Sequence, residues 1–105
     1  SDLIKVPAEI RFLSLEPLLG PVKINSSHLR DIRWVIVGGE SGNRARPMHP
    51  SWVKGIQQQC AECDVAFFFK QWGTFNSKGE KVGKKAAGRE FNGKVWDGMP
   101  QPVYV

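Results

Sequence analysis

The chain has 105 residues, 41% of them hydrophobic and four of them tryptophan, which is enough apolar material for the core of one domain. No apolar run approaches the roughly 20 residues that cross a bilayer, and no charged-then-apolar leader is present. Two cysteines are too few for a disulfide scaffold, which fits a reducing compartment. We therefore expect a folded, cytoplasmic protein rather than a disordered, secreted or membrane one.

The net charge is +5 and the pI is about 9.5, and the basic residues are unevenly distributed. Between residues 78 and 94 the only acidic residues are Glu80 and Glu90. The basic residues of this stretch are Lys78, Lys81, Lys84, Lys85, Arg89 and Lys94. Such a stretch is most often solvated surface, but net charge also bears on anionic partners, so nucleic acid is a possible partner.

The chain begins at Ser1, and residues 2–6 resemble the end of an element that starts upstream. We therefore expect a C-terminal fragment whose partner is the missing N-terminal half of the same chain. Residues 1–105 form one domain in this interpretation. Residues 1–73 hold strands and helices, and residues 74–105 form a basic loop, a hairpin and a tail.

The first three elements follow from apolar runs and from the residues that break them. Residues 11–15 read as a short strand that Glu16 and Pro17 stop. A serine at position 26 or 27 can cap a short helix that runs through Ile32. The apolar run Trp34 to Val37 then predicts a buried strand.

The second half begins with a longer helix, predicted from Pro50 to about Cys63. A third strand follows at residues 65–69, and the Gly- and Lys-rich residues 78–88 read as loop. Residues 89–91 and 94–96 flank Asn92-Gly93, a strong signal for a two-residue hairpin turn.

Apolar strands that alternate with helices predict an α/β fold with a parallel sheet covered on both faces. Three strands are an incomplete sheet, so the expected architecture is a partial (β/α) barrel with three parallel strands and intervening helices, followed by a C-terminal loop and β-hairpin. A larger open sheet is the alternative. An exposed sheet edge would also allow a homodimer.

Polar residues follow each predicted strand, at the end where α/β proteins bind ligands. Glu16 follows the first strand, Gly38 to Gly42 follow the second, and Lys70, Gln71 and Trp72 follow the third. We expect these residues to share one rim.

The loop after the second strand reads Gly38-Gly39-Glu40-Ser41-Gly42. Its glycines permit a sharp turn that exposes amide groups, and Glu40 could accept hydrogen bonds from an ammonium or from ribose hydroxyls. Arg44 and Arg46 could bind a carboxylate or phosphate. The alternative is a tight loop in which Glu40 pairs with these arginines.

The other two strand ends are also open to two interpretations. Glu16 either contacts a ligand or caps backbone amides. Lys70 follows three phenylalanines, where an apolar environment would suit a general base, or it forms an ion pair with Glu16 or Glu40. Trp72 either stacks on a base or plugs the mouth of the barrel.

Cys60 and Cys63 match a Cys-x-x-Cys pattern, but a redox pair needs its first thiol near a helix N-terminus, and these lie at the C-terminal end of the predicted helix. A zinc site needs two more ligands, and His28 and His49 have unsuitable spacings. We expect no metal site and assign Cys60 to the core.

The strings RFLSLEPLLGPV, WVIVGGESGNRARPMHPSWV, FFFKQWG and VGKKAAGREFNGKVWDGMP resemble the C-terminal half of a family of phage and prophage proteins of unsettled function. Members of that family are described as radical S-adenosylmethionine-like barrels, whose N-terminal cysteines hold an iron–sulfur cluster. The resemblance implies that the full-length protein uses both cofactors, that this fragment carries neither, and that it is inactive without its N-terminal half. The alternative is a nucleic-acid-binding module of a phage protein.

By match to these motifs, the rim residues would line the mouth of the barrel. The motifs do not divide these residues between cofactor and substrate. From their chemistry we expect catalytic roles for Lys70, Glu40 and Glu16. We expect cofactor binding by Gly38, Gly39, Glu40, Ser41 and Gly42, and substrate binding by Arg44, Arg46, Gln71 and Trp72.

Overall fold

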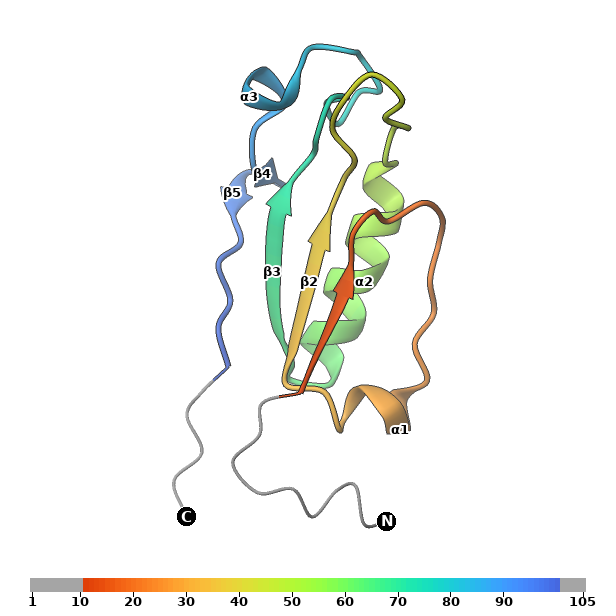
Figure 1. Cartoon of the computed structure of the whole chain (residues 1–105). Coiled ribbons are helices and arrows are strands. Elements are labelled where there is room, and N and C mark those ends of the chain that lie inside the picture. The colour runs from red at the N-terminus through yellow and green to blue at the C-terminus, as the bar shows by residue number, and fades with distance from the viewer. Residues whose placement is uncertain (1–10, 101–105) are drawn as a thin grey trace.

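The computed structural model describes residues 11–100, so the expected end of an upstream element at residues 2–6 lies outside the described part. Three parallel strands form one sheet in the order β1-β2-β3 (Figure 1). They are β1, Phe12–Leu15, β2, Trp34–Gly38, and β3, Ala66–Gln71. The prediction of three parallel strands is confirmed, and β3 runs two residues further than expected.

Helix α1, Ser26–Leu29, links β1 to β2 and is shorter than predicted. Asn25 caps it, because its Oδ1 accepts a hydrogen bond from the Ser27 amide at 2.9 Å. The predicted extension to Ile32 is wrong, because the Ile32 amide donates to the Leu29 carbonyl in a tight four-residue turn instead of continuing the helix.

Helix α2, Pro50–Glu62, links β2 to β3 and agrees closely with the prediction. Its N-cap is His49, whose Nδ1 accepts the Ser51 amide at 3.1 Å. Proline suits the first helical position, since its missing N–H would have no partner there.

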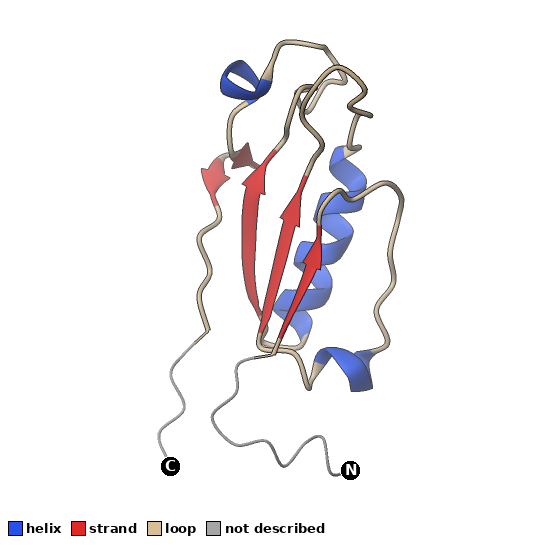
Figure 2. Ribbon diagram, in the orientation of Figure 1, coloured by secondary structure: helices blue, strands red, loops and turns tan. Residues whose placement is uncertain are grey.

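One face of the sheet packs against α2, which lies behind the strands in Figure 2. Val53, Ile56 and Cys60 point from the helix into the core, and each is at most 1% exposed. The alternating residues of the strands that face them are aliphatic or phenylalanine. They are Leu13, Leu15, Val35, Val37, Phe67 and Phe69. This side of the sheet is a complete core.

The opposite face carries Phe12, Trp34, Ile36 and Phe68, and no described helix covers it (Figure 1). Phe12 is 60% exposed, and the other three are only half-buried. The rings form a row, with centroids 6.3 Å apart for Phe12 and Trp34 and 6.1 Å apart for Trp34 and Phe68. The prediction that both faces are covered is therefore wrong for the described residues. The reason is that consecutive right-handed crossovers in a sheet of order β1-β2-β3 lie on the same side, so α1 and α2 cannot cover opposite faces.

Beyond β3 the predicted hairpin is confirmed as β4, Glu90–Phe91, and β5, Lys94–Val95. Its turn residues Asn92 and Gly93 have φ values of 53° and 84°, as a type I′ turn requires. Residues 78–88 are not wholly loop as predicted, because α3, Lys84–Ala87, forms one helical turn between two glycines.

The tail after β5 covers the outer edge of β3 in the antiparallel sense. The Phe69 amide donates to the Trp96 carbonyl, and the Gly98 amide donates to the Phe67 carbonyl, both at 2.9 Å. A Cβ at Gly98 would lie 2.5 Å from that Phe67 oxygen, so glycine permits the contact. Since β1 has no partner on its outer side within residues 11–100, β1 is the edge at which the parallel sheet can grow.

These residues form a mixed α/β domain with a three-stranded parallel sheet, and they do not by themselves make a barrel. Among residues 11–100, no helix has both the length and the apolar character that a bilayer crossing needs.

Candidate functional site at the C-terminal edge of the sheet

The strands place the predicted site residues along one edge, because all three run in the same direction. Glu16 directly follows β1, and Gly38 ends β2. Lys70 and Gln71 are the last residues of β3. The carboxyl ends of parallel strands lie at the same edge, which is where α/β proteins bind ligands.

Glu16 and Lys70 form an ion pair across β2, with Nζ 3.3 Å from Oε2. The Glu16 side chain also lies against Gly38, where an added Cβ would be 3.3 Å from Glu16 Cγ. The Lys70 side chain is 54% exposed, so the ammonium lies in solvent rather than in the apolar environment that a general base needs. Of the two interpretations of Lys70, the structure supports the ion pair with Glu16.

Glu40 and Arg46 form a second, bidentate pair in the loop after β2. Arg46 Nε donates to Oε1 and Nη2 donates to Oε2, each at 3.0 Å, and the Arg46 amide donates to Oε1 at 3.0 Å. Hydrogen bonding from the Arg46 side chain, and then from its amide, holds the pKa of Glu40 below its usual value. The same side-chain bond raises the pKa of Arg46. Ser41 and Arg44, from the same loop, are exposed.

The two loops beyond β2 and β3 touch at their backbones, and two glycines allow it. A Cβ on Gly39 would lie 1.9 Å from the Trp72 carbonyl oxygen, and a Cβ on Gly73 would lie 2.0 Å from the Glu40 carbonyl oxygen. The Gly39 amide donates to the Gln71 carbonyl, and the Thr74 amide donates to the Glu40 carbonyl, both at 2.9 Å. The sequence suggested that the Gly-Gly pair exposes amides, but Gly39 serves the junction between the loops.

Two polar side chains reinforce this junction. Gln71 Nε2 donates to the Gly39 carbonyl at 3.2 Å. Thr74 Oγ1 accepts the Gly42 amide at 2.9 Å and donates to the Gly42 carbonyl at 3.3 Å. Sequence reasoning missed Thr74, and the one signal for it was its place just after the third strand end. Gly42 and Gln71 are therefore engaged with other parts of the edge.

Trp72 packs inward and is 3% exposed. Its Nε1 donates to the Glu90 carbonyl at 2.7 Å, and its ring centroid lies 5.1 Å from that of Phe69 and 6.3 Å from that of Phe91. Trp72 is thus a plug rather than a stacking platform, which was one of the two outcomes considered for it.

Arg89 is a further residue of this edge that sequence reasoning counted only as charge. Its Nε donates to the Lys70 carbonyl at 3.1 Å and its Nη2 donates to the Phe69 carbonyl at 3.3 Å. It also pairs with Asp97, and its guanidinium lies 5.2 Å from the centroid of the Phe68 ring. Arg89 therefore ties the C-terminal segment to the end of β3.

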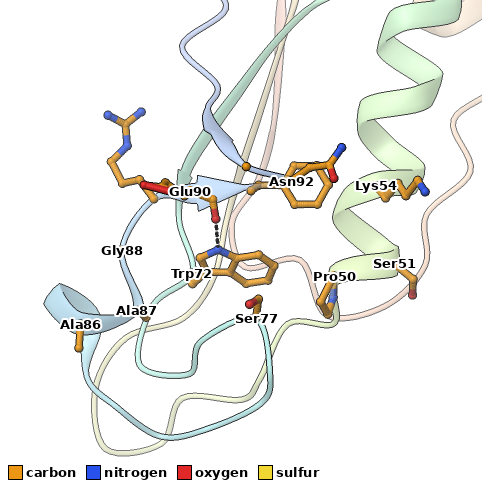
Figure 3. A pocket seen from close by; sticks show the side chains of 13 residues that line it. Pro50, Ser51, Lys54, Trp72, Ser77, Ala86, Ala87, Gly88, Glu90 and Asn92 are labelled. Carbon is orange, nitrogen blue, oxygen red and sulfur yellow. Dashed lines mark hydrogen bonds between the residues drawn. The ribbon is translucent and has the colours of Figure 1, made fainter.

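A groove of about 860 Å³ lies beside the edge (Figure 3). The first turn of α2 forms one side, Trp72 lies on the floor, and the end of α3 and the β4–β5 turn form the rest. Of the predicted site residues, only Trp72 lines this groove. Its lining residues are Pro50, Ser51, Lys54, Trp72, Ser77, Ala86, Ala87, Gly88, Arg89, Glu90, Phe91, Asn92 and Gly93.

The described residues do not fit an iron–sulfur cluster. The chain has two cysteines, fewer than such a cluster needs, and burial raises the pKa of the Cys60 thiol to about 12. No group of three His, Cys, Asp or Glu residues within residues 11–100 could hold a metal ion. S-adenosylmethionine would need hydrogen-bonding groups from the loop after β2. The Glu40 carboxylate already accepts from Arg46, and the Gly39 and Gly42 amides already donate to other parts of the protein, so these groups have partners.

Fold and site together define an α/β protein with a parallel sheet and a polar edge at the ends of its strands. The chain belongs to the family of proteins of unknown function named DUF5131, whose model matches residues 1–100. No curated protein and no solved structure matches this chain. The family description names no activity and no phage origin, so the radical-enzyme relationship stays a prediction.

Proposed function

We propose that this chain is the C-terminal part of a larger, phage-related enzyme of the radical S-adenosylmethionine-like class. Its polar edge would line the mouth that takes cofactor and substrate, and the chain alone would be inactive, because the cysteines of the cluster would lie upstream. The long motifs quoted above support this proposal, as does the position of the polar residues at the carboxyl ends of parallel strands.

The uncovered face of the sheet is the observation that carries the proposal. Parallel sheets occur almost only with both faces covered, yet Phe12 is 60% exposed and Trp34 and Phe68 are half-buried. The free edge of β1 adjoins this face, while the tail closes the edge of β3. Further strands added at β1 would extend the sheet and curve over the aromatic row, as in a partial barrel. A second copy paired through β1 is the alternative occupant.

Within this proposal the two ion pairs are the groups that a ligand would meet. Glu40 and Arg46 are both at the surface, and so are Glu16 and Lys70, so a ligand with charges of its own can exchange with either pair. We propose that Lys70, Glu40 and Glu16 act in catalysis as charged groups that exchange their present partners for the substrate, not as desolvated bases, with Arg44 and Arg46 binding substrate. The free thiols of Cys60 and Cys63 support a reducing, cytoplasmic location for the enzyme.

The test uses the complete protein encoded by the gene, purified without oxygen and supplied with iron and sulfide. The proposal predicts the visible absorption of an iron–sulfur cluster and reductive cleavage of S-adenosylmethionine. Glu40→Gln and Lys70→Met should reduce cleavage at least tenfold, whereas Glu62→Gln, on the exposed end of α2, should not.

An intact preparation that binds no cluster would contradict radical chemistry. Normal cleavage by both rim variants would remove the proposed roles of Glu40 and Lys70. Light scattering on the same preparation distinguishes the alternative. A dimer that becomes a monomer when the exposed β1 residue Ser14 is replaced, in Ser14→Lys, would show that a second copy pairs at this edge.

A further inference from the structure

We infer that the groove between α2 and the β4–β5 turn binds single-stranded nucleic acid through its phosphates. This inference goes beyond the proposed function and does not depend on radical chemistry. It starts from the groove of about 860 Å³, which is partly open to solvent and is lined by three separate segments of the chain (Figure 3). A groove that is open to solvent can hold part of a longer chain.

Basic residues border the groove on both sides. Lys54 lines it from α2, and Lys84 and Lys85 directly precede the lining residues Ala86 and Ala87. Lys94 is not one of them, because it lines a separate pocket with Trp96 and Asp97. The three lysines are exposed. They come from α2 and α3, which matches a partner whose charges are spread along a backbone.

These lysines are not neutralised by the ion pairs of the described residues. Those pairs join Arg46 to Glu40, Lys70 to Glu16 and Arg89 to Asp97. Glu90 is the one acidic residue in the groove lining. Lysine ammonium groups that remain in solvent beside an open groove attract phosphates and release the counterions of a nucleic acid when they bind.

The aromatic residues point to backbone contact rather than base stacking. Trp72 and Phe91 are at most 6% exposed, and Lys94 Nζ lies 4.0 Å from the centroid of the Trp96 ring. Stacking on a base was one expectation for Trp72, but these rings are all packed against protein. Binding should therefore depend on charge and show little preference for sequence.

The experiment measures fluorescence anisotropy of a labelled single-stranded oligothymidylate with the full chain, as salt is raised from about 50 to 200 mM. Three phosphate contacts predict a slope of log affinity against log salt of about −2.1, which is roughly an 18-fold loss over this range. The double variant Lys84→Gln/Lys85→Gln should reduce this slope to about −0.7, because two contacts are lost. Circular dichroism checks that each variant is folded.

The matched control is Lys23→Gln/Arg30→Gln, which removes two exposed cations near the other end of α2 and should leave the slope unchanged. The inference is overturned by absence of binding at 50 mM salt, by equal effects of the two double variants, or by a slope that Lys84 and Lys85 do not change. It is also overturned if a polyglutamate peptide competes as well as the oligonucleotide, since any polyanion would then serve.

Discussion

The two faces of the sheet are formed by the same strands but differ in how completely their side chains are buried. On the face under α2, Val35, Val37 and Phe69 are completely buried and close-packed. On the other face, neighbouring residues of the same strands leave a row of aromatic rings half in solvent, with Phe12 the most exposed.

The difference separates the part of the molecule that forms its own core from the part that we propose packs against further protein. Alternating residues of a strand point to opposite faces, so one sequence can specify a self-contained core and a contact surface together. Large aromatic side chains bury more area than the polar residues usual on a solvated face, and a row of them marks an interaction surface. The account therefore predicts that equal changes on the two faces have unequal effects.

The largest expected effect is the contrast between Phe69 and Phe68, adjacent residues of β3 that face opposite sides. Phe69→Ala should lower the free energy of unfolding by about 3–5 kcal/mol, because it opens a cavity in a closed core. Phe68→Ala should cost about 1–2 kcal/mol, because its ring is already partly solvated. Urea denaturation of both variants measures the difference. Equal losses in the free energy of unfolding would mean that the two faces are equally buried.

A second contrast concerns the junction beyond the strands. Gly39→Ala should cost about 3 kcal/mol, since its Cβ would lie 1.9 Å from the Trp72 carbonyl oxygen and backbone must move. Gly55→Ala is the matched control within α2, where nothing lies within 4 Å of the added Cβ, and it should stabilise by about 0.5–1 kcal/mol. Thermal unfolding compares the stability of the two variants. A Gly39→Ala variant as stable as the parent chain would show that the loops after β2 and β3 do not touch.

A smaller effect is expected from the Glu40–Arg46 pair, and it depends on pH. The pKa of Glu40 is lowered in the folded chain, so the pair stabilises the fold above the usual pKa of 4.5, and this contribution is lost as pH falls through the folded value. Glu40→Gln should therefore be less stable than the parent chain at neutral pH and equal to it in strong acid.

Urea titrations at several pH values test this dependence, with Glu62→Gln as the exposed control. A constant gap between Glu40→Gln and the parent chain down to strong acid would show that the Glu40 carboxylate is not the cause.

Sequence patterns predicted the elements whose signal is local. The apolar runs, Pro50 at a helix start and Asn92-Gly93 in a turn each determine their own structure, and all three predictions were confirmed. The helical turn α3 was missed because four residues between two glycines carry no periodic signal.

Many contacts of the site join segments far apart in the sequence, which no pattern in a single sequence reveals. The pairing of Lys70 with Glu16, 54 residues apart, is one such case. Glu40 and Arg46 lie six residues apart in one loop, and the sequence left open whether Arg44 or Arg46 is the partner. The cover of the β3 edge by residues 96–98 and the role of Arg89 in holding it also come from tertiary structure alone.

The most direct test of the central claim is the effect of Phe12→Ala on unfolding, measured in the 105-residue chain and in the complete protein. In the chain the loss should be less than about 1 kcal/mol, because the ring is 60% exposed and its contact is with Trp34. In the complete protein the loss should reach about 3–5 kcal/mol, the value expected when a fully buried phenylalanine is replaced by alanine. The same small loss in both would contradict the claim that this face is covered by the rest of the protein.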